Sequence, residues 1–152
     1  MFDFYVGHVS KEIVVVNLFG DLDDTSQDYF FGCIQDLMSD GYRQIVIDCQ
    51  GLGFISSRSL GRLIASRQKA SARQGKIYLT HLNSTLADLM SVTRLNSLFG
   101  IFRSTTSLLR KLRRAELSNI DEQYDHESRL YESANLAFDQ DNQDNQDNYI
   151  NM

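Results

Sequence analysis

A short apolar run constrains the fold of this chain more than any other feature. It is QIVIDC, residues 44–49, and it lies between two segments whose apolar residues recur at helical spacing. A strand that is apolar at nearly every position is typical of parallel sheets covered on both faces. The spacing predicts one helix over about residues 26–39 before this strand and another that ends near Arg73 after it.

Residues at the ends of these two helices fit capping roles. Thr25 or Ser26 is a candidate N-cap for the first helix, because a side-chain oxygen there can accept from a backbone N–H of the first turn. Gly41 follows the last turn of that helix, where a left-handed glycine commonly ends a helix. Gly75 has the same place after the second helix and is expected to close it.

The rest of the chain alternates between β-branched runs and helical patterns. The expected strands are 2–9, 13–20, 44–49, 76–82 and 98–102, and the other expected helices are 84–93 and 104–117. Ser10, Lys11 and Glu12 between the first two strands indicate a hairpin. We therefore predict an α/β fold with a mixed, mostly parallel sheet of about five strands and about four helices, in the order ββαβαβαβα.

Charge divides the chain into two parts. Residues 1–115 have 14 Lys and Arg against 10 Asp and Glu, a net charge of +4, whereas residues 116–152 have 1 against 10, a net charge of −9. The C-terminal part contains the repeat DQDNQDNQDN, which has almost nothing to bury. The prediction is a domain over residues 1–118 and an acidic, largely disordered tail over residues 119–152. Such a tail either keeps the protein in solution or competes for the basic face of the domain.

Several classes of function find little support. The chain has no apolar run of about 18 residues and no signal peptide, which predicts a cytoplasmic protein without a membrane partner. Cys33 and Cys49 are then expected to be reduced core residues. His8, His81 and His126 are far apart and lack metal-ligand spacing, and no nucleophile elbow is present. The sequence thus predicts no enzyme, no metal and no cofactor.

Basic residues gather on the last predicted helix. The cluster lacks interleaved aromatic residues and shares its helix with leucines, so it is expected to form the solvated outer face. We predict no nucleic-acid partner. The residues of the cluster are Arg110, Lys111, Arg113 and Arg114.

Three segments, in their order and spacing, match a known family pattern. They are GDLD at 20–23, IVIDCQGLGFISSRSLGRL at 45–63 and LNSLFGIFRSTTSLL at 95–109. Together they resemble the STAS domain, the fold of bacterial anti-sigma factor antagonists, over about residues 10–113. The resemblance implies binding rather than catalysis: in that family the domain docks onto a kinase-type anti-sigma factor and releases a sigma factor. Phosphorylation of a serine at the start of the second helix ends the association.

The candidate docking surface departs from the family pattern at one important position. The family's Asp-Ser-Ser-Gly falls on Ser56, Ser57, Arg58 and Ser59, so Arg58 occupies the usual phospho-acceptor position. Ser57 and Ser59 remain as possible phosphorylation sites. By resemblance, the partner-binding residues lie in the acidic turn and in the loop and helix start after the third strand. They are Asp21, Asp23, Asp24, Ser56, Ser57, Arg58, Ser59 and Arg62.

Simpler roles stay open for these residues. Ser56 and Ser57 can serve as helix caps alone, Asp23 as a turn residue, and Arg58 and Arg62 as an ordinary solvated helix face. Two functions follow. The first is an anti-sigma factor antagonist-like regulator of bacterial transcription, whose partner is a kinase-type anti-sigma factor or a related signalling protein. The second is a non-phosphorylatable STAS scaffold or sensory module in a signalling complex, which Arg58 favours.

Overall fold

The computed structural model describes residues 1–119 of the chain. The predicted disordered tail over 119–152 lies outside the described residues except for residue 119, so the proposed domain boundary stays a prediction. The chain divides into two units, Met1–Leu109 and Arg110–Met152. In the second unit the described residues, 110–119, are helical.

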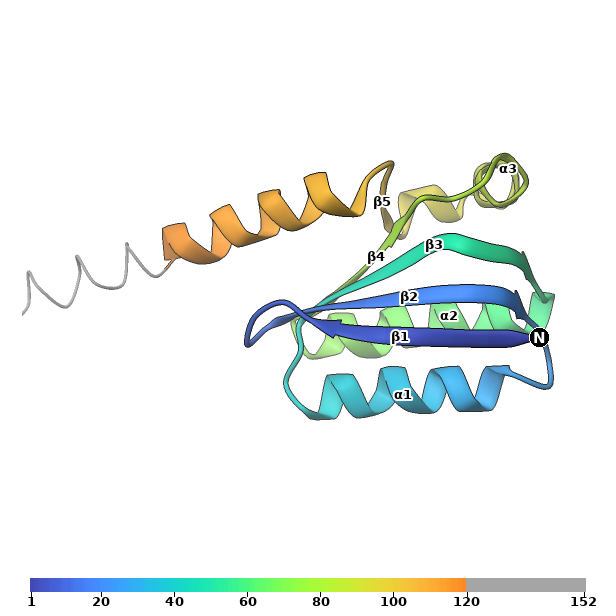
Figure 1. Cartoon of the computed structure of the whole chain (residues 1–152), viewed down its shortest axis with the longest axis horizontal. Coiled ribbons are helices and arrows are strands. Elements are labelled where there is room, and N and C mark those ends of the chain that lie inside the picture. The colour runs from blue at the N-terminus through green and yellow to red at the C-terminus, as the bar shows by residue number, and fades with distance from the viewer. Residues whose placement is uncertain (120–152) are drawn as a thin grey trace, which may run out of the picture. The chain divides into compact units, whose positions relative to one another are not determined.

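The first unit contains a five-stranded sheet and the helices that connect its strands (Figure 1). The strands lie in chain order, β1-β2-β3-β4-β5; β1 is antiparallel to β2, and every other neighbouring pair is parallel. This arrangement confirms the predicted α/β fold and its hairpin. The elements are β1 (Phe2–His8), β2 (Ile13–Leu22), α1 (Gln27–Ser39), β3 (Gln44–Ile55), α2 (Ser57–Ala72), β4 (Lys76–Thr80), α3 (Ser84–Val92), the 3-10 turn η1 (Leu95–Ser97) and β5 (Gly100–Phe102).

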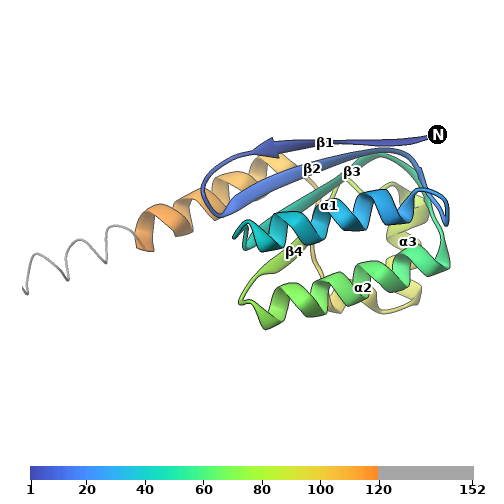
Figure 2. The same ribbon diagram turned by 90° about the horizontal axis from the view of Figure 1, so that it is seen from below.

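The main core lies between one face of the sheet and the helices. Helices α1 and α2 lie side by side on that face (Figure 2), and Leu86 and Met90 of α3 join the same buried cluster. Phe30 of α1 is fully buried, and its ring packs edge-on against Phe2 at 5.9 Å and Phe4 at 5.7 Å between centroids. Burial of these apolar side chains is the main force that holds the helices on the sheet.

The two cysteines are unpaired, as the sequence predicts. Cys49 is buried in the core and Cys33 is half-buried on α1. Burial, together with the nearby charge of Asp48, raises the pKa of the Cys49 thiol to about 12. This thiol therefore stays protonated and behaves as a small apolar side chain.

The predicted end of the third strand and the predicted start of the last strand are wrong. Strand β3 runs to Ile55 instead of ending at residue 49, because its second half pairs with the end of β2. Helix α2 ends at Ala72 with Arg73 as its C-cap, as predicted, and the Gly75 N–H donates to the Ala70 carbonyl oxygen of its last turn at 2.7 Å. The left-handed residue there is Gln74, with φ 61°, and an added Cβ on Gly75 would lie 2.9 Å from the Arg43 carbonyl oxygen. Strand β5 starts at Gly100, because Leu95–Ser97 forms the 3-10 turn.

Candidate functional site

The junction between β3 and α2 is a single residue and not the loop that the sequence predicts. Ile55 ends the strand and Ser57 begins the helix, so Ser56 alone connects them. The Ser56 N–H donates to the Leu22 carbonyl oxygen at 2.9 Å, and its hydroxyl oxygen accepts from the Ser59 N–H at 3.1 Å. The capping role that the sequence left open for Ser56 and Ser57 is thus observed for Ser56, whereas Ser57 is the first residue of the helix.

The acidic turn before α1 is organised by one carboxylate oxygen. Asp23 Oδ1 accepts from the backbone N–H and hydroxyl of Thr25, at 3.0 and 2.7 Å, and from those of Ser26, both at 3.1 Å. Ser26 occupies the N-cap position of α1, but its side chain makes no cap hydrogen bond to the helix. The turn role of Asp23 that the sequence left open is therefore observed.

These hydrogen bonds make the turn sensitive to acid. The Thr25 hydroxyl and N–H, followed by those of Ser26, lower the pKa of Asp23 to about 2 from its ordinary 3.8. Because this pKa is lower in the folded state, the ionised Asp23 carboxylate stabilises the folded domain. This contribution to the free energy of unfolding is complete above about pH 3.8 and is lost as the pH falls toward 2.

Substituting Asp23→Asn is expected to remove this part of the acid sensitivity. The amide oxygen of asparagine can still accept in the turn, but it does not titrate. The free energy of unfolding, measured in urea, should therefore fall less between about pH 4 and 2 in the variant than in the unaltered protein. Parallel losses in the two proteins over this window would contradict the assignment.

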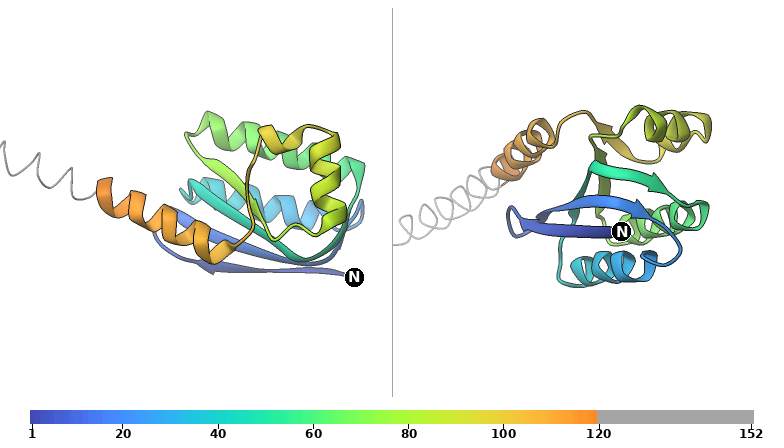
Figure 3. Two further views of the ribbon diagram at one scale, coloured as in Figure 1. Left: turned by 90° about the horizontal axis from the view of Figure 1, so that it is seen from above. Right: turned by 45° about the vertical axis from the view of Figure 1, so that its right-hand side comes forward.

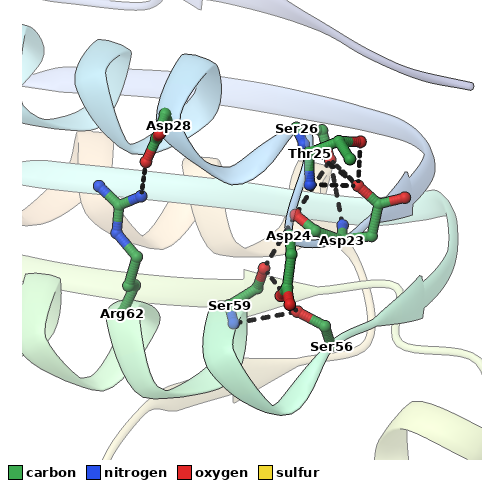
Figure 4. Close-up of polar contacts among 8 residues, drawn as sticks. All are labelled: Asp23, Asp24, Thr25, Ser26, Asp28, Ser56, Ser59 and Arg62. Atoms are coloured by element: carbon green, nitrogen blue, oxygen red, sulfur yellow. Dashed lines mark hydrogen bonds and ion pairs between the residues drawn. The ribbon is translucent and has the colours of Figure 1, made fainter.

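Hydrogen bonds join the acidic turn to the β3–α2 junction, although more than thirty residues of chain separate the two segments (Figure 4). The Ser56 hydroxyl donates to Asp24 Oδ1 at 3.0 Å and lies 2.9 Å from Ser59 Oγ. Ser59 Oγ in turn lies 3.4 Å from the carbonyl oxygen of Asp23. The two predicted halves of the surface therefore form one connected network at the carboxyl ends of β2 and β3.

The two candidate phosphorylation sites differ sharply in exposure. Ser57 and Arg58, the first two residues of α2, are exposed, and the described part of the chain offers neither side chain a hydrogen-bond partner or counter-ion. Ser59 is fully buried within the network, at 0% exposure. A kinase therefore has access to the Ser57 hydroxyl in the folded domain, whereas it cannot reach Ser59 without opening the junction.

The other predicted residues differ in how firmly they are held. Asp21 is the second-last residue of β2 and is exposed, and its carboxylate has no hydrogen bond within residues 1–119. Arg62 pairs with Asp28 of α1 at 2.5 Å, and its guanidinium lies 4.9 Å from the centroid of the Phe31 ring. Since Asp28 is mostly exposed, this pair adds about 1 kcal/mol at most, but it fixes the direction of Arg62.

Sequence reasoning missed both Asp28 and a second polar network on the opposite face of the sheet. Asp48 of β3 is buried, and its Oδ2 accepts from the Thr105 hydroxyl at 2.8 Å. The Thr105 N–H donates to His81 Nε2 at 3.3 Å, and its hydroxyl also contacts that of Thr80 at 2.5 Å. A signal was present: Asp48 is an acidic residue inside an otherwise apolar strand, and such a residue needs buried partners.

Among residues 1–119 no three His, Cys, Asp or Glu side chains are close enough together to hold a metal ion, and the three aspartates of the turn form no such group. No helix in this part of the chain has the length and apolar character needed to span a bilayer.

Comparison with known proteins identifies the family to which this sequence is similar. The family model described as "STAS domain" matches residues 7–108. No curated protein matches the chain. Among the solved structures that share this fold are three with 12–19% sequence identity.

The first is the anti-sigma factor antagonist SpoIIAA in its unphosphorylated form, 19% identical with a TM-score of 0.61 over 74% of this chain and 98% of the other. An anti-sigma factor antagonist from Mycobacterium paratuberculosis is 19% identical, with a TM-score of 0.66 over 74% and 95%. A sulfate transporter family protein from Wolinella succinogenes is 12% identical, with a TM-score of 0.61 over 70% and 89%.

Proposed function

Because the chain belongs to the STAS domain family, we propose that it is a protein-binding regulator of the anti-sigma factor antagonist type. Its partner is a kinase-type anti-sigma factor of the bacterial cytoplasm, and binding frees a sigma factor for transcription. The domain itself is not an enzyme in this proposal; any ATP belongs to the partner. Two solved structures of the same fold carry the name anti-sigma factor antagonist, which supports this choice.

One observation carries the proposed docking surface. The exposed side chains of Ser57 and Arg58 follow Ser56, whose N–H donates to the Leu22 carbonyl oxygen and whose hydroxyl oxygen accepts from the Ser59 N–H. Asp24 lies beside them through its bond to Ser56. A backbone that is already held by hydrogen bonds loses little conformational entropy on association, so a few well-placed charges on it can determine affinity.

The same position explains how phosphorylation at Ser57 would act. Phosphate adds a charge of about −1.5 to −2 at neutral pH. At the first residue of α2 this charge faces free backbone N–H groups and the positive end of the helix dipole, so the fold tolerates it. A partner surface that receives Arg58 would repel it. Association would therefore end while the domain stays folded.

A second candidate function is a STAS scaffold that has no phosphorylation switch. Arg58 at the usual acceptor position favours it, and so does the burial of Ser59, which leaves one accessible serine at the helix start. In this version Arg58 binds a carboxylate or a phosphate on the partner permanently.

Affinity capture from the source organism, followed by phosphate mapping, separates the two functions. With tagged full-length protein as bait, we expect a kinase-type anti-sigma factor to co-purify and phosphate to be found on Ser57. A signalling scaffold without a kinase, and an unmodified Ser57, would support the second function. Bait carrying Arg73→Glu, at the opposite end of α2, serves as a control and should capture the same proteins. If neither a kinase-type anti-sigma factor nor a signalling scaffold is captured, the result would contradict both candidate functions.

A further inference from the structure

A groove unrelated to the proposed docking surface opens beside the middle of β3 and the carboxyl ends of the adjacent parallel strands β4 and β5. Gln50 belongs to β3, His81 follows β4, and Arg103 follows β5, and all three side chains line the groove. Leu82, Ile101 and Phe102 supply apolar walls. The lining residues belong to β3, α3 and β5 or follow β4 and β5, and Figure 3 shows the backbone of these elements. In α/β proteins, ligands commonly bind outside the carboxyl ends of parallel strands.

A register shift in the sheet accounts for the position of Gln50. Asn17 of β2 is paired with Asp48, but Phe19 is paired with Gly51, so β3 contains one extra residue over this stretch. In a regular strand the side chains alternate between the two faces of the sheet, and such a bulge interrupts this alternation and redirects the side chain. Gln50 is exposed, and its side-chain amide has no hydrogen-bond partner within residues 1–119.

His81 is held so that one ring nitrogen remains available. Its backbone has a φ of 54°, which is uncommon for a residue with a side chain. Nε2 accepts from the Thr105 N–H at 3.3 Å, so in the neutral ring the proton is on Nδ1. No acceptor for Nδ1 exists among the described residues. His81 therefore presents an N–H donor that the protein itself does not use.

The charges around the groove favour an anion. Arg103 is exposed and forms no ion pair with any residue in the described range, so its planar guanidinium is free to take a carboxylate. The nearest acidic residue of the second polar network is Asp48, which is buried. Its two oxygens are taken by the Gln50 N–H at 3.0 Å and the Thr105 hydroxyl at 2.8 Å. Asp48 Oδ2 also lies 4.0 Å from His81 Nε2, the ring nitrogen that accepts from the Thr105 N–H, so this carboxylate is next to Nε2 and leaves Nδ1 available to the groove.

We propose that this groove binds a small organic anion, namely a carboxylate carried on a flat apolar body. Arg103 and the Nδ1–H of His81 receive the carboxylate, and the Gln50 amide adds a further hydrogen bond. The apolar body packs against Leu82, Ile101 and Phe102. A few convergent polar groups over apolar walls are the usual composition of a small-molecule site. None of these residues belongs to the proposed docking surface, so the site is independent of the proposed function.

Benzoate is a suitable probe, with benzamidine as a matched cation of similar size. In a ¹H–¹⁵N correlation titration of the full-length protein, benzoate is expected to give saturable shifts at Gln50, His81, Leu82 and Arg103, and benzamidine none. The Arg103→Gln variant should bind benzoate roughly fivefold more weakly, because it loses a partly screened charge-assisted contact. The Arg73→Gln variant removes an exposed arginine outside the groove and should bind benzoate unchanged.

Three outcomes would overturn the proposal. They are equal shifts with benzoate and benzamidine, benzoate shifts scattered over the surface, and equal weakening by Arg103→Gln and Arg73→Gln. The spectrum of each variant without ligand shows whether it is folded. Should Arg103→Gln not fold, His81→Asn takes its place, since asparagine accepts a positive φ; it should weaken benzoate binding, and unchanged binding would again contradict the site.

Discussion

An aspartate at position 59 is expected to destabilise the domain by about 3 kcal/mol or more, whereas an aspartate at position 57 leaves it folded. Ser59 is fully buried, and its Oγ faces the Ser56 hydroxyl and the Asp23 carbonyl oxygen. A carboxylate there would be desolvated and would oppose other oxygens. At the exposed position 57, the first residue of α2, it would gain about 0.3–1 kcal/mol from the helix dipole.

Urea unfolding followed by far-UV circular dichroism measures both effects. The Ser59→Asp transition should move to much lower urea, while Ser57→Asp stays at or slightly above the unaltered protein. Ser59→Ala serves as the control for loss of the hydroxyl alone and should cost about 1 kcal/mol. If the Ser59→Asp variant were as stable as the Ser57→Asp variant, position 59 would be open to solvent. This result would contradict the burial of Ser59, which would then again be a possible phosphorylation site.

Charge reversal at Arg58 is expected to lower affinity for the kinase-type partner by about 10- to 100-fold. The proposed contact joins the guanidinium to a carboxylate or phosphate, so glutamate both removes an attraction and adds a repulsion. The domain should not be weakened, because a negative charge in the first turn of α2 suits the helix dipole, and that turn contains no acidic residue. Affinity and stability are thus expected to change in different directions.

Calorimetric titration of the partner at two salt concentrations tests this expectation. Arg73→Glu makes the same change in charge at the exposed C-terminal end of α2, and it should bind almost as tightly as the unaltered protein. The difference between the two variants should shrink at high salt, because exposed charges are screened. An equal loss of affinity in the two variants would mean that net charge, and not position 58, governs binding.

The fold could be predicted where local sequence determines structure. Strand β2, the first half of β3 and helix α1 have clear periodicity, and Gly41 indeed ends α1 with a φ of 99°. The second half of β3 could not be predicted in this way, because QGLGF contains two glycines and no regular alternation. It becomes a strand since the end of β2 provides backbone partners across a register shift.

The proximity of the acidic turn and the helix start was predictable, but the contacts within the candidate site were not. Resemblance to the family brought the acidic turn and the helix start together, and Asp24 does bond to Ser56. The burial of Ser59 depends on the Asp23 carbonyl group, and the direction of Arg62 depends on Asp28. Both are contacts between segments more than thirty residues apart, which no local pattern contains.

Footprinting of the complex by ¹H–¹⁵N chemical-shift mapping tests most directly whether partners dock at the start of α2. Isotope-labelled protein bound to its unlabelled partner should show its largest shifts at Asp24, Ser57 and Arg58. Small shifts are expected at Lys11 and Gln74, since Lys11 lies before β2, Gln74 lies before β4, and these strands begin at the opposite end of the sheet. A footprint centred on Lys11 and Gln74, with Ser57 and Arg58 unperturbed, would contradict the account.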